Sequence, residues 1–179
     1  MSELNQIILL AKYNRLMNQR IMDAASLLSN EDLKKDQKAF FKSILGTLNH
    51  ILVGDIIWLK RFSGNPSSEN SLSYVSALKK PKSLGSMLFT DIKSLKKERV
   101  KIDAIIINWV NNLSESDLSS YISYNDMAGL SYNKQFSSLI NHLFLHQVHH
   151  RGQVTTLLSQ SGIDFGDTDL IEIIDDKNV

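Results

Sequence analysis

The stretch that decides the fold is residues 135–160, which read QFSSLINHLFLHQVHHRGQVTTLLSQ. Apolar side chains recur in it every three or four residues, as in an amphipathic helix that buries one face. They are Phe136, Leu139, Ile140, Leu143, Val154, Leu157 and Leu158. Ser161 and Gly162 follow, and glycine is common just after the last residue of a helix. We therefore predict a long helix from about Gln135 to Gln160.

Three more segments have the same helical period. They run from about Glu3 to Leu28, from about Ser43 to Phe62, and from about Leu84 to Leu113. The stretch from Gly64 to Lys82 contains both prolines and many Ser and Asn residues, which indicates a long crossover connection. Between Leu118 and Lys134, alternation around Gly129 predicts a short β-hairpin or flap before the last long helix. Together these features predict an all-α fold, a four-helix bundle.

Length and composition fit one globular domain spanning residues 1–179. The 20 Lys and Arg residues against 19 Asp and Glu residues leave a net charge of +1, which supplies no field to attract nucleic acid. The charge run Lys96–Arg99 is expected on a solvated helix face. Neither a secretory signal nor an apolar run of about 20 residues is present, so we expect no membrane association and a cytoplasmic location.

The histidines form the pattern that carries chemistry. Cysteine is absent, so any metal site must use nitrogen and oxygen ligands, and of the 5 histidines all but His50 lie between His142 and His150. His146 and His150 are four residues apart, which places both imidazoles on one helix face within reach of one ion. His142 lies one turn earlier, and His149 is rotated by about 100° from His150. His50, in the second predicted helix, is the remaining histidine and the expected third ligand.

Each of these histidines, taken alone, could be an ordinary hydrogen-bonded side chain; their joint occurrence favours a metal site. Gln147 stands where H-E-x-x-H metalloproteases have their glutamate base, which argues against that class. Three imidazoles leave an open coordination position and suit zinc or nickel, and also copper and iron. A fourth ligand from the flap, such as Asp126, would close the coordination and weaken the case for catalysis.

Two segments carry a resemblance to a known family. Residues 145–154, LHQVHHRGQV, resemble the H-x-x-H-H-R-G-Q signature of the DinB family of damage-inducible bacterial proteins. Residues 48–62, LNHILVGDIIWLKRF, are similar to that family's N-H-x-x-x-x-D-x-x-W-x-x-R-F helix. Residues 13–14 and 169–171 are also family-like, whereas residues 162–167 lack the prolines that many relatives have there.

The resemblance implies a four-helix bundle with one divalent metal ion, zinc or nickel, on His50, His146 and His150. Some members of the wider superfamily look like transferases that join low-molecular-weight thiols to electrophiles, and others resemble maleylpyruvate isomerases. We therefore expect a metal-dependent thiol S-transferase acting on a small-molecule substrate, with a thiol co-substrate. A homodimer is also expected. The alternative is a non-catalytic metal-binding bundle that serves as a dimerisation or stress-response module.

Five further residues are candidates for supporting roles. His142, His149 and Asp55 are possible general bases beside the metal. Arg151 and Gln153 could either line the pocket or hold neighbouring helices together.

Overall fold

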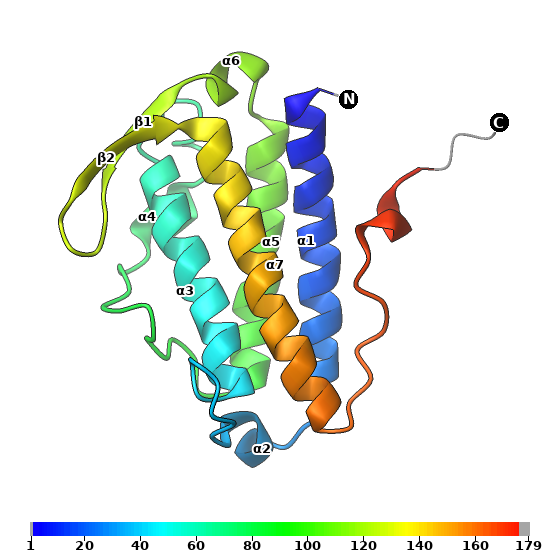
Figure 1. The fold of residues 1–179 in the computed structure, drawn as a ribbon. Helices are drawn as coiled ribbons and strands as arrows, with labels where there is room; N and C mark the ends of the chain where they lie inside the picture. The colour runs from blue at the N-terminus through cyan, green and yellow to red at the C-terminus, as the bar shows by residue number, and fades with distance from the viewer. Residues whose placement is uncertain (1, 176–179) are drawn as a thin grey trace.

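Four long helices dominate the computed structural model, which describes residues 2–175. They are α1 (Glu3–Ala25), α3 (Ile44–Phe62), α5 (Ile92–Asn111) and α7 (Phe136–Gln160). The four lie side by side, with α1 packed against α5 and α7, and α3 packed against α7 (Figure 1). The predicted helical class is confirmed, as are the positions of the first, second and last long helices.

A two-stranded hairpin precedes α7, as the sequence predicts. Strand β1 (Tyr121–Asn125) pairs antiparallel with β2 (Ser131–Gln135), with Tyr121 opposite Gln135. Strand β2 continues directly into α7, so the hairpin projects from the end where α7 begins (Figure 1). Three short helices complete the connections. They are α2 (Asn30–Lys34), α4 (Ser73–Ala77) and α6 (Glu115–Leu118).

Helices α3 and α5 run in the same direction, so the chain between them must travel back along the molecule (Figure 1). This is the predicted crossover, but it extends further than expected, because the third long helix begins at Ile92 and not at Leu84. The side chain of Asn49 accepts from the backbone N–H of Phe89 at 2.9 Å and donates to its carbonyl at 3.0 Å. These bonds hold the segment against α3 and remove the backbone groups that a helix there would need. Helix α5 begins only after Asp91, whose side chain caps it.

The expectation for the charge run Lys96–Arg99 is wrong at its last residue. Arg99 is 1% exposed and forms ion pairs with two buried carboxylates, those of Asp55 and Asp103. Arg99 lies four residues after the buried Leu95 and three before the buried Ile102, so the helix turns it toward the core. Lys96 instead pairs with Asp23 near the surface.

The segment after α7 runs back along α1 (Figure 1). The Tyr13 hydroxyl donates to the Thr168 carbonyl, and Arg20 forms an ion pair with Glu172 in the 3₁₀ turn Leu170–Ile173. Within residues 2–175, none of the helices has the length and apolar composition needed to cross a bilayer.

Candidate metal centre

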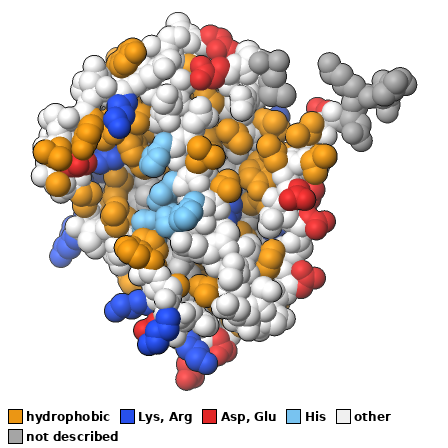
Figure 2. Space-filling view, viewed as in Figure 1, with side chains coloured by type: hydrophobic (Ala, Val, Ile, Leu, Met, Phe, Trp, Pro, Cys, Tyr) orange, Lys and Arg blue, Asp and Glu red, His pale blue; other side chains and the backbone are white. Residues whose placement is uncertain are grey.

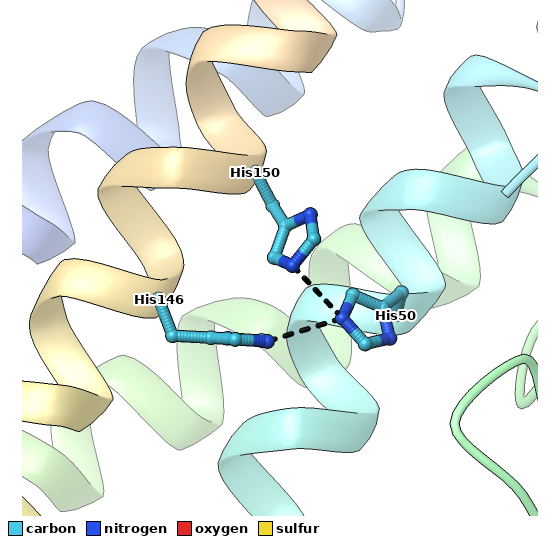
Figure 3. Close-up of side chains that lie close together, drawn as sticks. All are labelled: His50, His146 and His150. Carbon is cyan, nitrogen blue, oxygen red and sulfur yellow. Dashed lines mark hydrogen bonds between the residues drawn. The ribbon is translucent and has the colours of Figure 1, made fainter. Parts of the chain in front are cut away.

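Three imidazoles from two facing helices meet at one point. His50 comes from α3, while His146 and His150 come from successive turns of α7, and their rings point toward one another (Figure 3). The Nε2 atom of His50 lies 3.1 Å from Nε2 of His146 and 3.0 Å from Nε2 of His150. All three ligand atoms lie within 4.8 Å of one another. The structure thus brings together the three side chains that the sequence singled out.

The other ring nitrogens determine which atoms carry protons. Nδ1 of His50 lies 2.9 Å from the Leu84 carbonyl oxygen, which can only accept, so this Nδ1 is the protonated donor. Nδ1 of His150 lies 2.8 Å from Oε1 of Gln153 and donates in the same way. In neutral rings both Nε2 atoms then carry lone pairs, and these face each other at 3.0 Å. Two lone pairs at this distance repel unless a cation lies between them.

A metal ion fits this donor set. Metal–nitrogen bonds of about 2.0–2.1 Å place cis or tetrahedral imidazole nitrogens about 2.9–3.4 Å apart. The separations of 3.0 and 3.1 Å lie in that range. Hydrogen bonds from Nδ1 to a carbonyl or amide oxygen are also the usual way in which ligating histidines are oriented.

At its Nδ1 side, His146 is positioned by packing and not by a hydrogen bond. Its Nδ1 is buried without a partner in the described part of the chain. The ring passes over Gly54 of α3, where an added Cβ would lie 2.8 Å from Cε1 of His146. Gly54 therefore provides the space in which this imidazole can reach the other two.

Burial keeps the cluster neutral. Burial, reinforced by the neighbouring histidines, lowers the pKa of His146 to about 3. Burial is also the largest cause of the lowered pKa values of His50 and His150. Neutral imidazole is the form that binds metal, so the site is in its ligating state at neutral pH.

Phe41 forms one wall of the site. Its ring stacks on His50 with the centroids 3.7 Å apart and the planes at 15°, and it meets His150 edge-on at 5.6 Å. The loop that carries Phe41 folds over the first turn of α3, and a Cβ on Gly46 would lie 2.1 Å from the Phe41 carbonyl oxygen. Glycine at position 46 thus permits the approach that puts the aromatic ring on the histidine.

The comparisons with known proteins identify the family of the chain. The family model described as DinB family matches residues 1–176. The chain belongs to the DinB family. It is 25% identical over 161 residues to Protein DinB of Bacillus subtilis (strain 168), which covers 89% of this chain and 88% of that protein. No solved structure gives a significant match. The predicted family is therefore confirmed.

The other candidate residues of α7 lie on two sides of this helix. Gln153 lies beside the cluster and bonds both the His150 ring and, at 3.2 Å, the His149 ring. His142 is exposed, and its ring lies 6.0 Å from that of His146. Arg151 faces away from the cluster toward α1, where it donates to the side-chain oxygen of Asn14. This hydrogen bond and a further one to Asn18 join α7 to α1.

Within residues 2–175, the hydrogen bonds and the ion pair of Asp55 go to Arg99 and Gln147 and not to the three histidines. Asp55 is fully buried, pairs with Arg99 and accepts a hydrogen bond from Gln147 at 2.8 Å. Gln147 in turn accepts from Asn18, so the network joins α1, α3, α5 and α7. Asp55 thus lies in a network that links the four long helices.

Asp126 is not part of the cluster that the structure forms within residues 2–175. Its carboxylate accepts from the backbone N–H groups of Ala128 and Leu130 at 2.8 and 2.9 Å and so closes the hairpin turn. Within the described part of the chain, Asp126 is therefore not placed to act as a fourth ligand.

Sequence reasoning missed Phe41, the Leu84 carbonyl and Gly54. The spacing of four between His50 and Gly54 could have identified Gly54, because a small residue one turn from a ligand leaves room for a facing side chain. Phe41 and Leu84 lie in loops, where no periodic pattern predicts a contact with α3.

Proposed function

We propose that His50, His146 and His150 hold one divalent metal ion within a single-domain four-helix bundle formed by α1, α3, α5 and α7. The observation that carries this proposal is the pair of Nε2 lone pairs of His50 and His150 facing each other at 3.0 Å. The all-nitrogen ligand set favours zinc or nickel.

We further propose that the protein is a metal-dependent thiol S-transferase, which the family resemblance supports. A divalent ion at the cluster would act as a Lewis acid and lower the pKa of a bound thiol. The thiol sulfur then forms a bond to an electrophilic carbon, and the leaving group departs with the electron pair of its own bond. His142 accepts the proton that the thiol loses, because its ring centroid lies 6.0 Å from that of His146 and its lowered pKa, caused mainly by burial, keeps it neutral and able to accept.

The protein itself shapes the reaction space. Phe41 covers the cluster on one side and excludes water there, whereas His142 lies toward the hairpin. Histidine side chains gather near the middle of the face shown in Figure 2, with apolar side chains around them. A small molecule would therefore approach over α3 and α7.

The second candidate is a non-catalytic metal-binding module that pairs with a second copy of the chain. Leu145 and Val148 on α7 are 66% and 41% exposed, which favours burial of this face in an assembly. Homodimerisation is compatible with both candidates.

The test is a panel of thiols with a chromogenic electrophile such as 1-chloro-2,4-dinitrobenzene. Zinc- or nickel-loaded protein should consume thiol, while metal-free protein and metal-treated His50→Ala should not. If no thiol in the panel is consumed in a metal-dependent way, the transferase proposal fails. Retained metal binding in that case would support the non-catalytic candidate.

A further inference from the structure

A cavity of about 320 Å³ lies where the hairpin meets the C-terminal part of α3. Its lining includes Lys60, Arg61 and Lys80 together with Ile57 and Tyr124, and no acidic side chain from residues 2–175. Asp126 is near enough to act on Arg61, but it is occupied by the hairpin turn. The side chains of Lys60, Arg61 and Lys80 outnumber the neighbouring carboxylate of Asp126. The electrostatic potential in the cavity is therefore positive, which favours an anionic ligand.

Arg61 is held ready for such a ligand. Its guanidinium carbon lies 4.4 Å from the ring centroid of Trp58 and 4.6 Å from that of Tyr124. One nitrogen donates to the Asn125 carbonyl at 3.0 Å, which leaves further N–H groups for another acceptor. A guanidinium packed against two rings loses little freedom when it binds a carboxylate, a group whose geometry it matches.

Lys60 and Lys80 contribute differently. Lys60 donates to the carbonyls of Val75, Ser76 and Leu78 at the end of α4, so it adds charge but has its donors in use. Lys80 is exposed and lines the cavity from the crossover. The free donors facing a ligand therefore belong to Arg61 and Lys80.

The cavity lies on the same stripe of α3 as the metal ligand. His50, Gly54, Trp58 and Arg61 are spaced by three or four residues, and the axial distance from His50 to Arg61 is about 16 Å. The rings of Trp58 and His142 are 5.0 Å apart, so aromatic side chains connect the two ends. Figure 2 shows Lys and Arg side chains on the same face as the histidines.

We propose that this cavity binds a carboxylate of the small molecule whose other end reaches the three-histidine site. The substrate class is thus an acidic low-molecular-weight compound, long enough to span the stripe. This inference rests on the proposed function, because it identifies one end of that site's substrate. The carboxylate belongs to the thiol or to the electrophile, and the experiment separates the two sources.

The test uses metal-loaded, full-length protein and calorimetric titration with glutathione, which carries two carboxylates, and with its dimethyl ester. Wild type should bind glutathione more tightly than the ester. Lys80→Glu should weaken glutathione binding by about fivefold and leave ester binding unchanged. Lys79→Glu is the matched control, since Lys79 is equally exposed but does not line the cavity, and its affinities should equal those of wild type.

Arg61→Gln should have a larger effect, about tenfold, because it removes a charge-assisted hydrogen bond. Arg61 also supports the hairpin, so Lys80→Glu decides the matter if Arg61→Gln does not fold. A second titration series with 4-chloro-3-nitrobenzoate and its methyl ester tests the electrophile as the source. Preference for the acid in either pair, lost in Lys80→Glu and kept in Lys79→Glu, supports the proposal and names the source.

The proposal is overturned if wild type prefers neither acid, or if Lys79→Glu and Lys80→Glu weaken binding equally. Failure of the proposed function has a different signature. In that case metal loading does not produce thiol consumption in wild type, whatever the preference for acids.

Discussion

His146 is held neutral by burial, and this has a consequence for stability. Its pKa of about 3 lies below the ordinary value of 6.5, so between these values the unfolded chain binds a proton that the folded chain does not. The metal-free protein should therefore keep this contribution above about pH 6.5 and lose it progressively as the pH falls toward 3. Urea midpoints measured across this range should fall more steeply for wild type than for His146→Ala. Equal slopes would contradict the assignment.

Phe41 gives a second prediction for a single side chain. Phe41→Ala removes the ring that stacks on His50, and an aromatic contact of this kind contributes about 0.5–1.5 kcal/mol. Zinc affinity, measured by competition with a chromophoric chelator, should fall about two- to twelvefold. Phe40→Ala is the control, because Phe40 is 88% exposed and meets the Phe41 ring only edge-on, so it should change affinity less than Phe41→Ala. Equal losses in the two variants would remove Phe41 from the site.

What the sequence predicts for single residues depends on whether they lie in helices. His146 and His150 follow from helical spacing, and His50 from its setting within a second family-like helix. Phe41 contacts His50 through a loop whose path is set by tertiary packing, so local spacing carries no sign of it. Arg99 shows where helical spacing was overlooked. The charge run Lys96–Arg99 is expected on a solvated face, but one residue in three or four of a helix faces the core, and here it is Arg99.

The pairing of α3 with α7 depends on the absence of a side chain at Gly54. Gly54→Ala should push the His146 ring out of place, lower zinc affinity at least tenfold and destabilise the protein, because the new Cβ would lie 2.8 Å from Cε1 of His146. Gly152→Ala is the matched control on α7, where nothing lies within 4 Å of an added Cβ. There the better helix propensity of alanine should raise the free energy of unfolding by up to about 1 kcal/mol. Chelator competition and urea unfolding of both variants test this, and similar behaviour would contradict it.

At the scale of elements, periodicity predicts three of the four long helices closely and places the hairpin. It fails at residues 84–91, which share the apolar character of α5 but hydrogen-bond to Asn49 and His50 of α3. The short helices α2, α4 and α6 were also missed, because each has at most five residues and too few turns to show a period.

The whole molecule is tied together by the buried network around Arg99. Removing this cation leaves Asp55 and Asp103 buried without their partner, so Arg99→Leu should lower the free energy of unfolding by about 3–5 kcal/mol. Lys96→Ala, from the same charge run, breaks a more exposed ion pair with Asp23 and should cost less than about 1 kcal/mol. Urea unfolding of the two variants makes the comparison. Similar losses would mean that the network does not hold the helices together.

The most direct test of the three-histidine site is the metal content of the protein. The protein is purified without an affinity tag or chelator and then supplied with zinc or nickel. Elemental analysis should find about one divalent ion per chain in wild type and in His142→Ala, since one three-histidine site is available and His142 lies outside it. His146→Ala should retain little metal, because it removes one of the three converging nitrogens. Equal metal content in wild type and His146→Ala, or none in wild type, would contradict the three-histidine site.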